Sequence, residues 1–214
     1  MGTISRSIAA PGHVRSRRHA PDQPGLCRAP SSLRLLSCRA GNVAVEFGLA
    51  VPVLLMLMLA SAELGRFVLL HQKVDRVATT VSDLVSRAET ISESQLDDIF
   101  LAAGHVATPF DLAGLGVVIV SSIANPSGDG KGPIIAWQRS GSGSYSGSSQ
   151  LGTEGDEAEL PEDFEVRVGE TAIISEVYYD FAPFLSELIV EPQEVYRSSL
   201  HRPRLGLLDE IEED

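Results

Sequence analysis

Cysteine is nearly absent from this chain of 214 residues: its two cysteines, Cys27 and Cys38, lie within the first 40 positions. The rest of the chain therefore has no thiols with which to form a disulfide framework or a Cys-x-x-Cys metal site. Basic residues are also scarce after position 70, because residues 71–214 contain nine Lys and Arg against 26 Asp and Glu, a net charge of −17. This charge excludes a basic nucleic-acid-binding domain, and we expect no nucleic-acid partner.

Motifs that carry catalysis or bind metals are missing as well. Residues 125–132 lack the first glycine and the final Ser or Thr of a phosphate-binding loop, and Tyr145 stands where a nucleophile elbow has serine. The acidic clusters do not follow the residue order of a calcium loop. The five histidines occur singly, at no spacing typical of a metal site: His13, His19, His71, His105 and His201. We therefore expect no enzyme, no metal site and no cofactor.

The sequence does contain one long apolar segment. Residues 47–62 read FGLAVPVLLMLMLASA without a charge, and the stretch from Val43 to Ala62 includes only Glu46 as a charged residue. About 20 apolar residues in a helix span the hydrocarbon core of a membrane, and proline is tolerated in such helices. We expect a single transmembrane helix within residues 42–70; the soluble alternative is a buried core helix.

The charges on the two sides of this segment predict its orientation. Residues 1–40 contain seven Arg and one Asp, a net charge of +6. Basic residues next to a membrane helix stay on the cytoplasmic side. We therefore expect residues 1–41 to be a disordered, basic cytoplasmic leader or tail. Residues 71–214 would then be an exported domain, periplasmic or extracellular, of a single-pass protein of the inner cell membrane.

Helical periodicity continues beyond the predicted span. Apolar residues recur there at steps of three and four, with polar residues on the other faces. They are Phe67, Leu70, Val74, Val77, Val81, Leu84, Ala88 and Ile91. The pattern predicts one continuous helix from Val43 to Ala88 whose second half is amphipathic. Its apolar face packs either on the protein's own domain or partly on helices of other subunits.

A second helix is predicted after this one. Ser92 and Gln95 have the spacing of a capping box, which predicts a helix from Glu93 to about Val106. Proline at position 109 follows the end of this helix.

Strands are predicted in the remainder of the chain. Four segments are rich in Val, Ile and Tyr and are separated by Gly or Pro clusters: residues 115–123, 133–139, 170–181 and 193–201. The Gly/Ser-rich residues 140–150 are predicted to form a long exposed loop. Helices followed by strands indicate an α+β fold, in which an antiparallel sheet packs on the long helix.

The start of the apolar segment carries a family resemblance. The chain has Val45-Glu46-Phe47, then Pro52-Val-Leu-Leu55, then Glu63-Leu-Gly-Arg66. These motifs, in this order, resemble the TadE-like family of tight-adherence (Flp, type IVb) pilus systems of bacteria. Val177-Tyr-Tyr-Asp-Phe-Ala-Pro183 and Arg202-Pro-Arg-Leu-Gly206 are further similarities near the C-terminus. The main resemblance covers residues 41 to about 85.

The resemblance implies a membrane-anchored minor pilin, or pseudopilin, or an assembly component of the cell envelope. Such a protein acts by helix packing and subunit interaction, and its partners are membrane lipid and other pilins or pilus-assembly proteins. In processed pseudopilins a prepilin peptidase cleaves after a glycine, and a glutamate follows five residues later. Gly41 and Asn42 match the cleavage point, and Glu46, followed by Phe47, matches the assembly glutamate.

Two questions stay open at this point. Phe47 replaces a frequent tyrosine, the leader of 41 residues is long, and other relatives keep their N-terminus, so both a processed pseudopilin and an uncut anchor fit the sequence. A membrane-tethered exported binding module, unrelated to pili, also fits; it would capture a ligand or cell-wall polymer through its loops.

Overall fold

The protein is described from a computed structural model that covers residues 39–126, 132–141, 143–161, 164–183 and 190–212. The chain divides into two compact units, Met1–Pro52 and Val53–Asp214. The described residues of the first unit, 39–52, are helical and begin helix α1 (Arg39–Ser86). The predicted leader therefore lies outside the described residues, except for its last three positions, and the following paragraphs concern the second unit.

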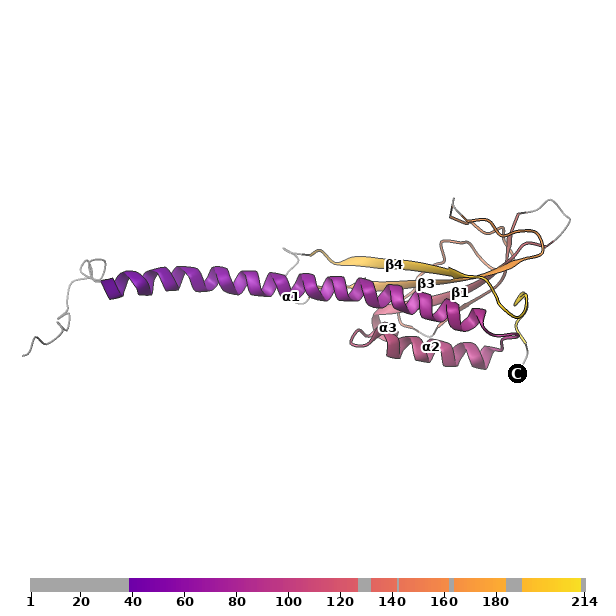
Figure 1. Cartoon of the computed structure of the whole chain (residues 1–214), viewed down its shortest axis with the longest axis horizontal. Helices are drawn as coiled ribbons and strands as arrows, with labels where there is room; N and C mark the ends of the chain where they lie inside the picture. Colours follow the sequence, from indigo (N-terminus) through magenta and orange to yellow (C-terminus); the bar gives the residue numbers. More distant parts are fainter. Residues whose placement is uncertain (1–38, 127–131, 142, 162–163, 184–189, 213–214) are drawn as a thin grey trace, which may run out of the picture. The chain divides into compact units, whose positions relative to one another are not determined.

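The described residues form three helices and four strands. After α1 come α2 (Glu93–Ala107), α3 (Leu112–Leu115), β1 (Gly116–Ala124), β2 (Ile134–Ser140), β3 (Thr171–Phe181) and β4 (Gln193–His201). The four strands form one antiparallel sheet in the order β2-β1-β3-β4 (Figure 1). The predicted α+β fold, with a long apolar helix packed against an antiparallel sheet, is confirmed.

The start of α2 follows the predicted capping box. The Ser92 side chain accepts a hydrogen bond from the backbone N–H of Gln95, and the Gln95 side chain accepts one from the backbone N–H of Ser92. Two N–H groups that the helix leaves without partners are satisfied in this way. Figure 1 shows α2 beside the C-terminal part of α1, and Lys73 Nζ joins the two helices by donating to the carbonyl oxygen of Val106, 3.1 Å away.

The main core lies between α1, α2 and one face of the sheet. The residues that α1 contributes are buried: Leu70, Val74, Val77, Ala78, Val81 and Val85. They pack with Leu96 and Ala103 of α2 and with residues of the sheet such as Val120, Ile173 and Val177. The apolar face of α1 is therefore covered by the protein's own domain, as the first of the two alternatives predicted.

One residue of the predicted apolar face lies elsewhere. Leu84 is 41% exposed, and the next residue, Val85, is fully buried in its place. A straight helix rotates by about 20° for every seven residues relative to a strict heptad repeat. Two heptads after Leu70, this drift has carried position 84 off the buried face and brought position 85 onto it.

The second face of the sheet is covered too, in part by residues of the Gly/Ser-rich loop, which is irregular and largely exposed as predicted but also contacts the sheet. Residues 143–150 have no regular secondary structure, yet Tyr145 and Ser149 are partly buried against the sheet. The Glu176 carboxylate is fully buried beneath this segment. It accepts hydrogen bonds from Ser149 Oγ, from the backbone N–H of Gln150 at 2.9 Å, and from the Tyr196 hydroxyl at 2.9 Å. Both faces of β1 and β3 are apolar, so the sheet requires cover on each side.

Candidate functional site

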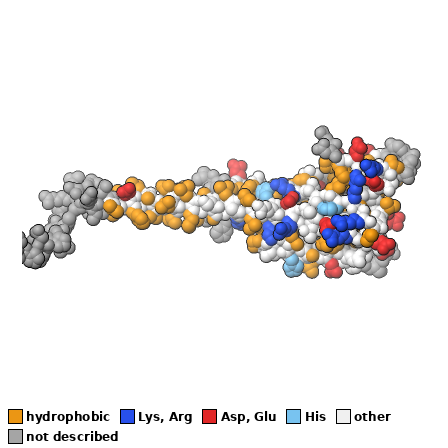
Figure 2. Space-filling view, viewed as in Figure 1, with side chains coloured by type: hydrophobic (Ala, Val, Ile, Leu, Met, Phe, Trp, Pro, Cys, Tyr) orange, Lys and Arg blue, Asp and Glu red, His pale blue; other side chains and the backbone are white. Residues whose placement is uncertain are grey.

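The apolar part of α1 has an uncovered surface. Its large hydrophobic side chains from Val43 to Leu59 include eleven that are between 39% and 70% exposed, and Figure 2 shows them in orange along this part of the helix. Among the described residues, α1 is the one helix long and apolar enough to cross a membrane, and none of its most apolar window is buried. Exposed apolar side chains in this number are unfavourable in water, and the length and composition of the helix suggest a single membrane span.

The predicted assembly residues lie on this surface. Glu46 is exposed, and the ring of Phe47 is 67% exposed. Within the part of the chain that the structure describes, no hydrogen bond or ion pair involves the Glu46 side chain. Gly41 and Asn42 belong to the backbone of α1, but their side chains lie outside the described residues, so the cleavage prediction is not tested.

The E-L-G-R motif ties α1 to the sheet. Arg66 Nη1 donates a hydrogen bond to the carbonyl oxygen of Ala182, 3.1 Å away, just after β3 ends. The same nitrogen lies 3.6 Å from Oε1 of Glu63, one turn earlier, whose carboxylate is only 2% exposed. The motif therefore joins α1, at the end of its apolar run, to the residues that follow β3.

Aromatic rings complete this junction. The guanidinium carbon of Arg66 lies 5.3 Å from the centre of the Phe181 ring and 5.9 Å from that of Phe110, within the range of cation–π attraction. The Phe67 ring meets the edge of Phe181, with 5.2 Å between ring centres. Burial raises the pKa of the neighbouring Tyr179 phenol, while the charge of Arg66 opposes that rise and the charge of Asp111 adds to it. We refer to Glu63, Arg66, Phe67, Phe181 and Ala182 as the anchor.

Sequence reasoning did not predict the anchor, although it identified both halves as motifs. The motifs at Glu63–Arg66 and 177–183 are each recognisable in the sequence. Their contact, from Arg66 to Ala182, joins residues 116 positions apart. The sequence offers two signals for such a contact. One is an acid and an arginine three residues apart at the end of an apolar run, and the other is a second motif rich in aromatic residues. The pairing of the two motifs could not be read from their spacing.

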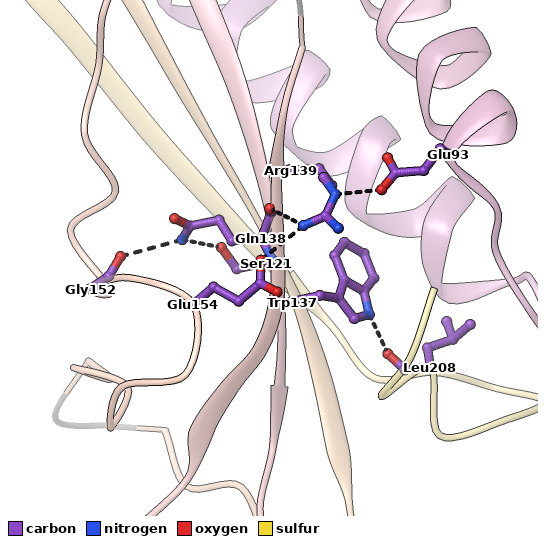
Figure 3. Close-up of polar contacts among 8 residues, drawn as sticks. All are labelled: Glu93, Ser121, Trp137, Gln138, Arg139, Gly152, Glu154 and Leu208. Atoms are coloured by element: carbon purple, nitrogen blue, oxygen red, sulfur yellow. Dashed lines mark hydrogen bonds and ion pairs between the residues drawn. The ribbon is translucent and has the colours of Figure 1, made fainter. Parts of the chain in front are cut away.

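A second polar network holds the β2 edge of the sheet (Figure 3). Arg139 binds Glu93 of α2, with 2.6 Å between Nε and Oε1, and Glu154, with 2.8 Å between Nη1 and Oε2. Gln138 Nε2 donates to Ser121 Oγ at 2.8 Å. These contacts join α2, the sheet and the segment after residue 150, which gives them a structural role. Among the described residues, no group of three or more His, Cys, Asp or Glu side chains is placed to hold a metal ion.

A comparison with protein families identifies the helical segment. Residues 41–82 match the model of the family described as TadE-like protein. The chain carries a TadE-like domain. No curated protein and no solved structure matches this chain. The match includes the apolar surface of α1 and most of the α1 face that is buried in the core. It also includes Glu63 and Arg66, the two residues of the E-L-G-R motif that belong to the anchor. It confirms the resemblance stated from the sequence.

Proposed function

We propose that this TadE-like chain is a membrane-anchored minor pilin, or pseudopilin, or an assembly component of a Flp-type (type IVb) pilus, and that it acts by helix packing and subunit interaction. The observation that carries this proposal is the family match over residues 41–82. The TadE-like family implies a role in assembly of this kind of pilus. The uncovered apolar surface from Val43 to Leu59 supports the proposal because packing against lipid and other pilins would cover it.

Glu46 is the residue that would control helix packing. A carboxylate within an apolar helix is costly in lipid unless a cation meets it. The free α-amine of a neighbouring pilin that prepilin peptidase has processed would provide that cation. Cleavage between Gly41 and Asn42 would likewise give this chain an α-amine of its own. Phe47, exposed beside Glu46, would then pack against the same neighbour. In this mechanism the protein needs no catalytic group of its own.

The charge distribution supports the proposed topology. With a net charge of +6 before the apolar segment and −17 after position 70, the N-terminus would remain in the cytoplasm and the sheet would be exported. The anchor would hold the exported sheet on the last turns of the membrane helix, so that a force on the helix would reach the domain. This arrangement suits a subunit that is moved out of the membrane during assembly.

A membrane-tethered binding module is the second candidate. It is favoured by a pocket of about 450 Å³ beside α2, which has Asp97 and Asp98 at its rim and Phe100 and Val117 among its apolar residues. Such a module would function without pilins.

Replacement of Glu46 distinguishes these two candidates. In cells that make the pilus, Glu46→Ala should leave the chain in the membrane fraction and abolish surface pili, whereas Glu159→Ala, a substitution of an exposed acid in the sheet domain, should leave pili unchanged. Electron microscopy of sheared surface fibres gives the measurement. Normal pili in cells that lack this chain altogether would favour the binding module.

A further inference from the structure

A pocket of about 440 Å³ opens beside the anchor and shares Arg66 with it. Its walls are mostly apolar and include Leu69 of α1 and Leu115 at the end of α3. Three polar side chains also line it: Arg66, Asp111 and Tyr179. The pocket lies wholly within the second unit, and neither of its charged residues is part of the apolar surface described above.

The two charges of the pocket are available to a ligand. Arg66 Nη1 makes the hydrogen bond to Ala182 and the 3.6 Å contact with Glu63, and the side chain is 38% exposed. Asp111 is exposed. Its Oδ1 accepts the hydrogen bond that caps α3, from the N–H of Gly114 at 3.0 Å, and the described residues give it no ion pair. The pocket is therefore lined by one cation and one anion.

The position of the pocket along α1 points to the membrane surface. Arg66 follows the last residue of the uncharged run, Ala62, by four positions, which is about 6 Å at 1.5 Å per residue. Apolar side chains on this turn are still exposed, Val68 by 53% and Leu69 by 40%. If the apolar run lies in the hydrocarbon core, the pocket lies at the depth of the lipid headgroups.

We infer that this pocket binds the headgroup of a phospholipid with a primary amine, phosphatidylethanolamine, with the phosphate on Arg66 and the ammonium on Asp111. The glycerol and the start of the acyl chains would contact Leu69 and Leu115. This inference rests on the membrane span of the proposed function. An anionic headgroup without an amine would place its charge beside Asp111 and leave that carboxylate unpaired. A choline headgroup has no N–H with which to bind the carboxylate.

The test compares the same substitution, glycine to leucine, at one position that lines the pocket and at one position outside it. A Cβ atom added at Gly65, which lines the pocket, meets nothing within 4 Å, so the backbone has room for a side chain there and Gly65→Leu should occupy part of the pocket. Gly104 in α2 has the same open surroundings and lines the other pocket, beside α2, so Gly104→Leu is a matched control that leaves the pocket at Arg66 unchanged. Both substitutions also remove a glycine from a helix, so neither should weaken its helix.

The full chain is reconstituted in bilayers that contain phosphatidylethanolamine, phosphatidylcholine and phosphatidylglycerol in equal amounts. It is then extracted, and the retained lipid is identified by native mass spectrometry. We expect wild type and Gly104→Leu to retain phosphatidylethanolamine in excess, and Gly65→Leu to lose about tenfold of that retention, equal to about 1.4 kcal/mol of binding free energy. Asp111→Asn keeps an oxygen to cap α3 and should shift the preference toward phosphatidylglycerol.

Equal retention of the three lipids by wild type, or retention unchanged by Gly65→Leu, would overturn the inference. Binding of soluble phosphoethanolamine as tight as that of the lipid would overturn the membrane lipid as the source of the ligand. Recovery of the chain in the membrane without a lipid preference rejects this inference alone. Recovery outside the membrane fraction rejects the proposed function and this inference together.

Discussion

Trp137 Nε1 donates a hydrogen bond to the main-chain carbonyl oxygen of Leu208, 2.8 Å away. Ser122 Oγ donates to the same oxygen at 2.7 Å. Leu208 has a φ angle of 51°, a left-handed conformation that is costly for a residue with a side chain. Two buried donors therefore hold the C-terminal segment against the sheet in a locally strained conformation.

The shared acceptor predicts that substitutions at the two donors are not additive. Trp137→Phe or Ser122→Ala alone leaves the Leu208 carbonyl with one donor, and the hydrogen bond lost contributes about 1 kcal/mol. The double variant leaves a buried carbonyl without a donor, which adds about 1–3 kcal/mol. Urea unfolding of the full chain in detergent, followed by circular dichroism, should show a double-variant loss larger than the sum of the single losses. A strictly additive result would contradict the shared role of Leu208.

The packing of α1 predicts that an acid at Val77 and an acid at Leu84 have different effects on stability. Val77 is fully buried, whereas Leu84, which the heptad spacing also placed on that face, is 41% exposed. Val77→Asp should destabilise the sheet domain by several kcal/mol because it buries an unpaired charge. Leu84→Asp should change the free energy of unfolding by less than about 0.5 kcal/mol, as surface substitutions do.

Limited proteolysis of the membrane-extracted chain checks this pair, with wild type and Leu84→Asp expected to resist cleavage equally. Wild-type resistance in Val77→Asp would show that α1 does not support the sheet.

Much of the fold could be predicted because its signals are local. Runs rich in Val, Ile and Tyr located each strand to within one residue, and the last strand, Gln193–His201, matches its predicted bounds. The capping box at Ser92 gave the start of α2. The cover on the second face of the sheet could not be predicted, because residues 143–150 have neither helical nor strand periodicity, and their contact with Glu176 depends on a residue more than 20 positions away.

The candidate site likewise has one part that the sequence predicts and one part that it does not. Apolar length and the motif at Val45–Phe47 predicted the TadE-like segment, since both are contiguous in sequence. The anchor was not predicted, because the contact of Arg66 with Ala182 joins residues 116 positions apart. Its formation depends on where β3 ends relative to α1, and that is set by the packing of the whole core.

The tyrosines predict how stability depends on alkaline pH. A hydrogen bond to Glu194 raises the pKa of Tyr145 to about 12, and burial raises the pKa of Tyr196 to about 12, from an ordinary value of 10.0. Burial also raises the pKa values of Tyr178 and Tyr179. The native state therefore holds these protons more tightly than the unfolded state, so the contribution of Tyr145 and Tyr196 to stability is complete below pH 10.0 and is lost as the pH rises through about 12.

The four tyrosines of the chain make this measurable by tyrosinate absorbance. The folded chain should show much less ionisation at pH 10.0 than the chain unfolded in urea, which is about half ionised there. Tyr145→Phe should remove one titrating group near pH 12. Titration of the folded chain centred on pH 10.0 would contradict the buried arrangement of the phenols.

The last prediction separates a processed pseudopilin from an uncut anchor. If the peptidase cleaves after Gly41, a large side chain there should block it, because the backbone approach at the scissile bond leaves room for only a small residue. Wild type should then be smaller than Gly41→Leu by about 4.4 kDa, the share of 41 residues in a chain of 214 residues and 22.9 kDa. Intact-mass analysis and N-terminal sequencing of the membrane-extracted chains measure this, with Asn42 expected as the first residue of wild type.

Glu46→Ala tests the step that follows cleavage. Its carboxylate lies beyond the cut, so this variant should still be processed to the same mass as wild type, while the α-amine of the neighbouring pilin loses its partner and assembly fails. Gly41→Leu should fail for a different reason, since it keeps its leader and exposes no new α-amine. Equal masses for wild type and Gly41→Leu, both beginning near Met1, would reject processing. An uncut chain has no α-amine at position 42 to offer a neighbour, so its Glu46 would pair only with the amine of a neighbour that has itself been processed, and Glu46→Ala would still weaken assembly.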